Sequence, residues 1–271
     1  MKTMEGRKFK TIQRFYVQLE NGRSVEVSSG SVLGQISGHE NLIDPLSGIV
    51  AEIEGVPAPI PFAYLSPEFD YQTTILLLHG FNSAPGNKEG IIKEWLAEKE
   101  LGEKVIVIAP QLHYNPAEAI RQIGTIVQEN YGNIVVIGTS LGGFYANYIR
   151  AVNPSERIKV HSLNPSWSPA ESLKNEVKQQ RNLKTNEDWY FEEAFLANLR
   201  VIEQKCKDSL KKYSGNHFTL HLAMQDELLK FDDLLAYLDA NQVAHRLFHY
   251  DTNHRFEKVT EMLDNSIGDF Q

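Results

Sequence analysis

A serine in the middle of the chain stands in a pattern suited to nucleophilic chemistry. The pattern is Gly138-Thr139-Ser140-Leu141-Gly142, between the apolar run 134–137 and a helix-like segment, 143–150. A strand, then G-x-S-x-G, then a helix is the context of a nucleophile elbow, a sharp turn that exposes the serine hydroxyl. The glycines at both ends let strand and helix approach closely. The pattern predicts that Ser140 is a nucleophile.

An activated serine needs a base, and the base needs an acid to orient it. Residues 218–224 predict a strand with Asp226 just past its end, and residues 245–250 predict another with His254 just past its end. Catalytic groups of open α/β sheets lie beyond the carboxyl ends of the strands. The order Ser, Asp, His is that of α/β-hydrolases. We therefore predict Asp226 as the orienting acid and His254 as the base.

Other acids and histidines are weaker candidates. Glu227 could replace Asp226 as the orienter, because neighbouring side chains on a loop are hard to rank. Asp232 and Asp233 fall in the next predicted helix and indicate a solvated face. A packed or surface imidazole is expected within predicted strands, which hold His221, His245 and His249. His161 lies on an earlier strand, upstream of the acid.

Acyl transfer also requires donors for the developing oxyanion. One is the backbone N–H of the residue after the nucleophile, Leu141. The other is expected from the loop after the apolar strand 74–78, where Phe81 follows a glycine. In this loop His79 is expected to order the backbone by a hydrogen bond rather than to transfer protons. Asn82 and Ser83 are expected to cap the loop, with substrate contact as the alternative.

Other kinds of site find no support in the sequence. The glycines before Lys88 do not have phosphate-loop spacing, and no G-x-G-x-x-G or H-E-x-x-H occurs. Cys206 is the single cysteine, so a cysteine-rich zinc site is excluded. Its place in a charged helical segment predicts an incidental thiol. We expect no metal and no cofactor.

Composition restricts the class of protein further. The chain has 271 residues and a net charge of −8, which argues against nucleic acid as a partner. No apolar run approaches the length of a membrane span. The first eight residues lack the apolar segment of a secretory signal. One cysteine permits no internal disulfide and suits a reducing compartment, so we expect a cytoplasmic protein. Nothing in the sequence indicates an oligomeric state.

Strands alternate with helical segments from residue 74 onward, which predicts an α/β fold with a mostly parallel sheet flanked by helices. The predicted strands are 74–78, 104–108, 133–137, 158–163, 217–224 and 245–250. The predicted helices are 88–100, 116–130, 142–152, 228–238 and 255–266. We assign residues 71–271 to one α/β-hydrolase-like domain with a helical insertion at about 168–213.

Residues 1–70 differ in pattern and predict a small β-rich extension or module. Two alternating segments, 15–20 and 23–27, flank Asn21-Gly22 and predict a hairpin. Residues 29–48 look loop-like, and 49–53 could form a strand. The prolines of 56–61 predict a stiff connector.

The insertion carries aromatic and aliphatic residues at a helical spacing. Trp189, Phe191, Phe195, Leu199 and Ile202 predict one apolar helix face, because from Phe191 onward they recur every three or four residues. Such a face either packs on the core or forms a cap whose aromatic side lines an acyl pocket.

Several motifs in order resemble the small bacterial YqiA-type esterases. They are residues 77–83 with Pro85 and Lys88, 109–112 with Pro116 and Ala119, 137–146, 163–165, 225–227 and 253–256. The resemblance covers about residue 74 to the C-terminus. It implies an α/β-hydrolase fold, carboxylesterase or thioesterase activity, and the triad Ser140, Asp226 and His254. The first seventy residues and Ser166-Trp167 depart from the family pattern.

These observations predict a serine hydrolase that cleaves small carboxylic esters or thioesters through an acyl-enzyme. An amidase or peptidase could use the same triad, although nothing marks a peptide groove. The alternative of another class is a non-catalytic hydrolase-fold protein that binds a partner through residues 1–70.

Overall fold

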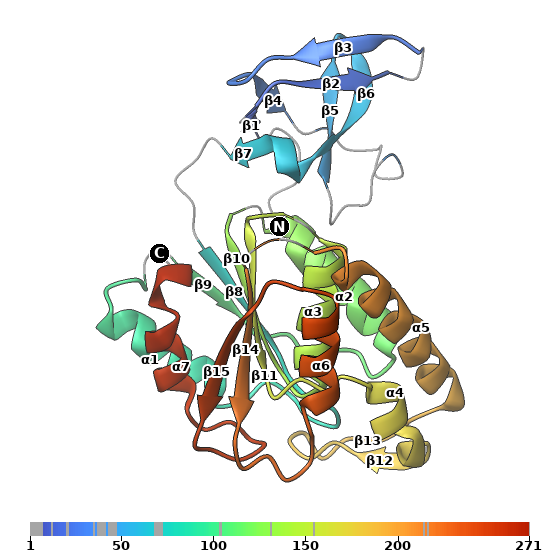
Figure 1. The fold of residues 1–271 in the computed structure, drawn as a ribbon, viewed down its shortest axis with the longest axis vertical. Coiled ribbons are helices and arrows are strands. Elements are labelled where there is room, and N and C mark those ends of the chain that lie inside the picture. Colours follow the sequence, from blue (N-terminus) through green and yellow to red (C-terminus); the bar gives the residue numbers. More distant parts are fainter. Residues whose placement is uncertain are drawn as a thin grey trace.

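The computed structural model describes residues 8–11, 13–19, 22–34, 36, 42, 48–67, 73–102, 105–130, 132–153, 155–213, 215 and 217–270. A six-stranded sheet forms its centre, in the order β15-β14-β11-β10-β8-β9 (Figure 1). All five strand pairings in this sheet are parallel. The strands are β8 (Thr73–Leu78), β9 (Val105–Ile108), β10 (Ile134–Thr139), β11 (Ile158–Leu163), β14 (Phe218–Ala223) and β15 (Arg246–Tyr250). The predicted α/β fold is confirmed.

Helices cover both faces of the sheet. On one face lie α1 (Lys88–Glu98) and α7 (Val259–Asn265). The other face carries α2 (Pro116–Glu129), α3 (Leu141–Val152), α5 (Glu193–Leu210) and α6 (Asp232–Ala240) (Figure 1). Strand β10 is buried on both faces. Ile134 and Val136 pack in the hydrophobic cluster with α2, α3, α5 and α6, while Val135 and Ile137 pack in the cluster with α1 and α7. A strand buried on both faces reads as a continuous apolar run.

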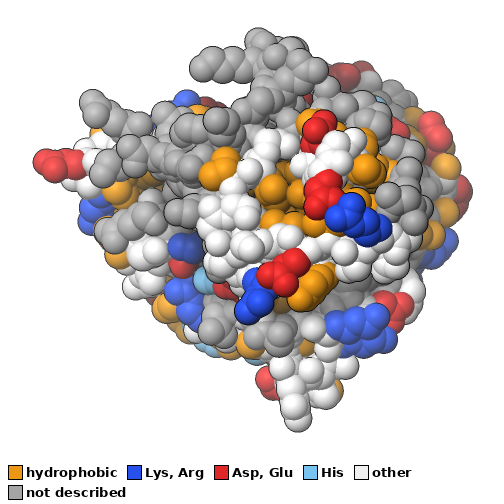
Figure 2. Space-filling view, turned by 90° about the horizontal axis from the view of Figure 1, so that it is seen from above, with side chains coloured by type: hydrophobic (Ala, Val, Ile, Leu, Met, Phe, Trp, Pro, Cys, Tyr) orange, Lys and Arg blue, Asp and Glu red, His pale blue; other side chains and the backbone are white. Residues whose placement is uncertain are grey.

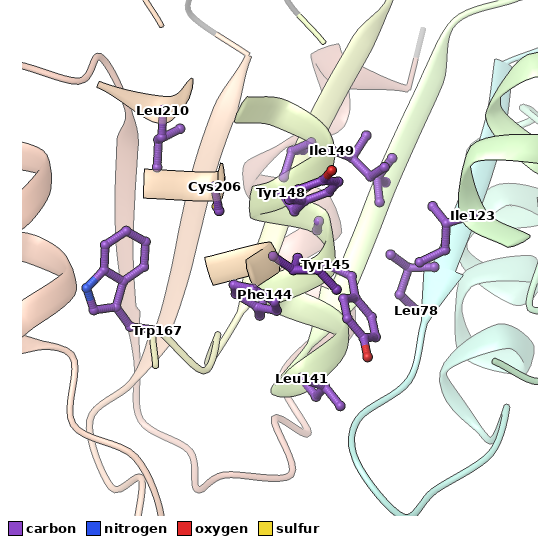
Figure 3. Packing of buried hydrophobic residues seen from close by; sticks show 14 of the residues in the cluster. Leu78, Ile123, Leu141, Phe144, Tyr145, Tyr148, Ile149, Trp167, Cys206 and Leu210 are labelled. Carbon is purple, nitrogen blue, oxygen red and sulfur yellow. The ribbon is translucent and has the colours of Figure 1, made fainter. Parts of the chain in front are cut away.

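Helix α3 is the most deeply buried helix of the described chain, and it is the helix that follows the candidate nucleophile. Residues 141–150 of this helix are all buried. Figure 3 shows Phe144 and Tyr148 of α3 in the same cluster as Cys206 and Leu210 of α5. Helices α3 and α5 pack against each other, so the start of α3 is held by the core.

The chain between β11 and β14 forms a short helix, a hairpin and a long helix. These are α4 (Pro169–Ser172), η3 (Lys174–Glu176), the antiparallel strands β12 (Gln179–Arg181) and β13 (Asp188–Tyr190), and then α5. The single apolar helix face predicted from Trp189 to Ile202 is wrong at its start. Trp189 lies in β13, and Phe191 precedes the helix. Leu199 and Ile202 do pack α5 on the core.

The N-terminal region has its own hydrophobic cluster, which shares no residue with the two clusters of the sheet. The predicted hairpin is confirmed as β2 (Phe15–Gln18) paired with β3 (Ser24–Val27), although Asn21 of its turn lies outside the described residues. β1 (Lys8–Thr11) pairs with β4 (Val32–Gly34) and β7 (Leu65–Pro67), and η2 (Phe62–Tyr64) precedes β7. Strand β4 interrupts the predicted loop 29–48, much of which lies outside the described residues.

The proline-rich segment predicted as a stiff connector is a strand, β6 (Val56–Pro61), paired with β5 (Gly48–Ile53). The prediction fails because Pro57, Pro59 and Pro61 occupy alternate positions. Alternate residues of a strand point their backbone N–H toward the same side, so one side of β6 lacks donors while the other pairs normally. Prolines on an open side also hinder pairing with another chain.

No helix within the described parts of the chain is long and apolar enough to cross a membrane.

Candidate active site

Ser140 occupies a strained turn between β10 and α3. Its φ is 56° and its ψ is −117°, a backbone region that non-glycine residues rarely adopt. The turn closes tightly because both flanking glycines meet backbone. A Cβ at Gly138 would lie 2.1 Å from the carbonyl oxygen of Gly142, and one at Gly142 would lie 2.2 Å from that of Leu78. These are the contacts that a nucleophile elbow requires.

The loop after β8 lies directly against this serine. A Cβ added at Gly80 would lie 3.3 Å from the Cβ of Ser140 and 3.8 Å from its Oγ. Phe81, the predicted oxyanion donor, is the next residue. Leu141, the other predicted donor, is the first residue of α3, where backbone N–H groups have no partner within the helix. The structure thus brings both predicted donor segments to Ser140.

His79 orders this loop, as its sequence position predicted. Its Nε2 accepts the N–H of Leu112 at 3.0 Å, and its Nδ1 lies 2.9 Å from the carbonyl oxygen of Gly80. Since Nε2 accepts, Nδ1 carries the proton and donates to Gly80. Burial lowers the pKa of His79, which favours this neutral form. The imidazole therefore joins the loops after β8 and β9.

Asp226 and His254 meet at the carboxyl edge of the sheet. His254 Nδ1 lies 2.7 Å from Asp226 Oδ2, and the two side chains are 15% and 2% exposed. The other oxygen of Asp226 accepts the N–H groups of Leu228 and Leu229 at 2.9 and 2.7 Å. Both carboxylate oxygens are thus engaged, and the side chain has a single orientation toward the imidazole. Lys88 Nζ anchors the same loop by donating to the Arg255 carbonyl oxygen at 2.7 Å.

Glu227, the alternative orienter, binds a different atom of the same histidine. Its Oε2 accepts the backbone N–H of His254 at 3.1 Å, and this hydrogen bond lowers the pKa of Glu227. It does not contact the imidazole in the structure. Asp232 and Asp233 open α6, away from this pair.

The other candidate histidines lie elsewhere. His161 and His221 are fully buried and face each other across β11 and β14, with Nδ1 and Nε2 3.0 Å apart. His249 is exposed on β15, and His245 Nδ1 lies 2.8 Å from the Val243 carbonyl oxygen. All four are structural or surface imidazoles, as predicted for His221, His245 and His249.

The hairpin β12–β13 is fastened to the loop after β8, an arrangement that sequence reasoning missed. Asn82 has a φ of 52°, and its Oδ1 accepts the indole N–H of Trp189 at 3.1 Å. Its Nδ2 donates to Gln180 Oε1 at 3.3 Å, and its carbonyl oxygen accepts the N–H of Leu183 at 3.0 Å. Asn82 is therefore a connector between the candidate oxyanion loop and the insertion.

A second asparagine fastens the same two segments. Asn182 is 0% exposed, and its Nδ2 donates to the Ser83 carbonyl oxygen at 2.9 Å and to the Tyr114 hydroxyl at 3.1 Å. Tyr114 in turn stacks on Trp189 with ring centroids 4.1 Å apart. The hairpin thus contacts the loops after both β8 and β9.

Phe81 and the insertion form an aromatic cluster beside the candidate site. The Phe81 ring packs edge-on against Trp189 and Phe191, at 5.6 and 5.3 Å between centroids. Phe195, in the first turn of α5, contacts Phe191 at 6.0 Å. The aromatic residues of the insertion therefore pack against the candidate oxyanion loop. This arrangement combines the two predicted alternatives, since the residues pack on the core and also lie beside the candidate site.

The single cysteine and the described metal-ligating residue types do not form a second reactive site. Cys206 is fully buried, and burial raises its pKa to about 12, so it is an inert thiol. Across the residues that the structure describes, no three His, Cys, Asp or Glu side chains cluster as metal ligands would.

Solved structures share this architecture. The esterase Est1E from Butyrivibrio proteoclasticus matches with a TM-score of 0.54 at 14% identity, over 83% of this chain and 97% of its own. The monoacylglycerol lipase from Paleococcus ferrophilus matches at 0.52 and 13%, over 72% and 92%. S-formylglutathione hydrolase (FrmB) from Staphylococcus aureus matches at 0.53 and 13%, over 94% and 96%. The parallel sheet, the strained turn after β10 and these likenesses define an α/β-hydrolase fold.

The chain belongs to the family described as "Uncharacterised protein family (UPF0227)", which matches residues 74–271. The resemblance to YqiA-type esterases over this region is thereby confirmed. The match begins at β8 and leaves out the N-terminal region.

Proposed function

We propose that the protein is a serine hydrolase that cleaves carboxylic esters or thioesters through Ser140, His254 and Asp226. The observation that carries the proposal is the 2.7 Å contact between His254 and Asp226 at the sheet edge where the strained Ser140 turn also lies. Because Nδ1 of the imidazole faces the carboxylate, Nε2 is the nitrogen left to exchange a proton with the serine.

The reaction has two halves. Ser140 Oγ attacks the carbonyl carbon of the substrate while its proton passes to His254, and Asp226 stabilises the imidazolium. The N–H groups of Phe81 and Leu141 bind the tetrahedral oxyanion. The intermediate expels an alcohol or thiol, which takes the proton from His254. Water then attacks the acyl carbon while one of its protons passes to His254. The bond between the acyl carbon and Ser140 Oγ breaks, His254 returns the proton to Oγ, and the acid leaves.

The partner of this site is a small acyl ester or thioester. The names of the similar structures include an esterase, a lipase and an S-formylglutathione hydrolase, which supports this range of substrates by analogy. We also propose a cytoplasmic location, supported by the single cysteine and the absence of a disulfide.

Turnover of a matched panel of acyl esters and acyl thioesters tests the proposal. Wild type is expected to hydrolyse at least one class, and Ser140→Ala is expected to lose turnover while it keeps its fold. Ser172→Ala is the control, because among the described residues its hydroxyl bonds to the Pro169 carbonyl oxygen within α4 and to Ser166. Substantial turnover by pure Ser140→Ala protein would reject the mechanism.

A further inference from the structure

A buried asparagine directly after β11 binds the two segments that carry the acid and the base. We propose that Asn164 is a positioning residue whose side-chain amide holds the backbone of His254 against the end of β14, so that Asp226 meets the imidazole. This inference rests on the proposed function, because it assigns the residue to the same site.

The side-chain amide of Asn164 uses both of its ends. Its Oδ1 accepts the N–H of Ala223, the last residue of β14, at 2.7 Å. Its Nδ2 donates to the carbonyl oxygens of Asn253 at 3.2 Å and of His254 at 3.1 Å. An amide offers an acceptor and a two-proton donor on one carbon, so it suits one N–H and two carbonyl groups. The partners also fix which end is oxygen.

The backbone of Asn164 adds a second requirement. Its φ is 44°, and the side chain is 0% exposed. Asparagine is among the few non-glycine residues that adopt the left-handed region readily. Such conformations persist where the surrounding structure demands them, often beside functional groups. The position therefore requires both the amide and this backbone conformation.

Two exposed side chains also join the end of β14 to the histidine segment. Gln225 Nε2 donates to Asp251 Oδ1 at 2.6 Å, and Glu227 accepts the N–H of His254 at 3.1 Å. Exposed hydrogen bonds exchange readily with water and fix geometry weakly. The buried bonds of Asn164 therefore constrain the backbone of His254 more strongly than these two exposed bonds do.

The same short segment also holds the nucleophile. The carbonyl oxygen of Leu163 accepts the N–H of Ser140 at 3.0 Å, and the N–H of Ser166 donates to the Ser140 carbonyl oxygen at 3.1 Å. Asn164 lies between these two contacts in the chain. Residues 163–166 thus connect the backbone of the serine to the backbone of the histidine.

Replacing Asn164 by aspartate tests the donor end of the amide. The carboxylate keeps an oxygen for Ala223 and tolerates the left-handed conformation, but its second oxygen opposes two carbonyl oxygens. A displacement of ~1 Å in a catalytic group costs about a hundredfold in rate. For Asn164→Asp we expect kcat to fall about a hundredfold with KM little changed. Asn164→Gly keeps the backbone conformation without the side chain and serves if the aspartate variant does not fold.

A spectroscopic readout separates positioning from a loss of stability. The proton on His254 Nδ1, shared with Asp226, should give a downfield NMR resonance that disappears in His254→Ala. In folded Asn164→Asp and Asn164→Gly we expect this resonance to shift or broaden. The measurement needs no substrate, so it tests the positioning role even when turnover is absent.

A matched buried amide provides the control. Asn147 on α3 is also 0% exposed, and its Oδ1 accepts the Ser162 hydroxyl rather than a group of the histidine loop. Asn147→Ala should lose stability but keep the resonance and the kcat of the folded protein. Folded Asn164 variants with wild-type kcat and resonance would overturn the inference, as would an equal loss in Asn147→Ala. A wild type that turns over no ester contradicts the proposed function instead.

Discussion

The two carboxylates that follow β14 bind the same histidine at different atoms. Asp226 faces the imidazole, whereas Glu227 accepts the backbone N–H. Their order along the chain could not rank them, since both stand just past the strand. The ranking comes from the turn, in which the N–H groups of Leu228 and Leu229 hold Asp226 inward.

A pair of isosteric substitutions tests this division of roles. Asp226→Asn should lower kcat by about 10⁴-fold, as loss of the orienting carboxylate does in serine proteases, because an amide favours the wrong imidazole tautomer. Glu227→Gln should leave kcat nearly unchanged, since its amide oxygen still accepts a backbone N–H. Steady-state kinetics on one activated ester gives both values. Equal losses in the two variants would contradict the assignment.

Sequence alone located the candidate nucleophile, acid and base, because each follows a recognisable strand in the order that the fold requires. Asn164 was visible only as part of a family motif. Its side-chain partners Ala223 and His254 lie 59 and 90 residues further along the chain. No local pattern encodes hydrogen bonds of that separation, so the role becomes visible only in three dimensions.

Among the elements, the hairpin β12–β13 has the closest connection to the candidate oxyanion loop. Its strands have only three residues each, and Phe191, just past β13, stands four residues before Phe195 and so continues the helical spacing of α5. A helical period was therefore predicted where a hairpin forms. By contrast, the predicted bounds of β10 and β11 lie within two residues of the observed bounds, because long apolar runs identify buried parallel strands.

Removing one hydrogen bond between hairpin and loop should weaken catalysis. Trp189→Phe keeps an aromatic ring beside Phe81 and Tyr114 but loses the donor to Asn82. We expect kcat to fall about tenfold, less than the 10²–10³-fold cost of deleting an oxyanion donor. Tyr190→Phe is the neighbouring control, because Tyr190 is 56% exposed. Wild-type kcat in Trp189→Phe would show that the loop keeps its geometry without this hydrogen bond.

A chain of buried polar groups crosses the other half of the sheet. His161 Nε2 lies 3.3 Å from Asp269 Oδ2, His161 Nδ1 lies 3.0 Å from His221 Nε2, and His221 Nδ1 lies 2.9 Å from the Tyr250 hydroxyl. Burial lowers the pKa of His161 and lowers that of His221 well below its usual value. Burial therefore favours the neutral form of both imidazoles in the folded protein.

This arrangement predicts a loss of stability in mild acid. Below about pH 6.5 the unfolded chain binds protons at His161 and His221 that the folded chain does not, so the free energy of unfolding falls with decreasing pH. The slope approaches about 1.4 kcal/mol per pH unit for each histidine. Urea unfolding between pH 7.5 and pH 5 measures it. His221→Gln should reduce the slope, whereas His249→Gln, at an exposed position, should leave it unchanged. A slope that His221→Gln does not alter would refute this reading.

For the molecule as a whole, the N-terminal strands and the parallel sheet have separate hydrophobic clusters. The chain enters β8 at residue 73, at the amino end of the sheet, whereas the candidate site lies at the carboxyl end (Figure 1). Figure 2, seen from above, views the end of the molecule that carries the N-terminal strands, and acidic and basic side chains there lie among hydrophobic ones. Among the described residues of this face, the charged side chains do not form a large patch of one sign.

We therefore propose that residues 1–70 form a module separate from a hydrolase domain of residues 71–271. A chain of residues 71–271 should fold, unfold cooperatively and keep the kcat of the full chain, because its core and its candidate site are internal to it. Thermal unfolding and ester turnover of the shortened protein check this. An insoluble or inactive fragment would mean that the N-terminal strands support the sheet.

The central claim is that Ser140 is activated by His254 and Asp226. Labelling with a fluorophosphonate, read by intact mass and peptide mapping, tests it most directly. We predict one adduct on wild type at Ser140, no adduct on Ser140→Ala, and much slower labelling of His254→Ala. Well-folded wild type without an adduct, or an adduct that persists on Ser140→Ala, would contradict the account.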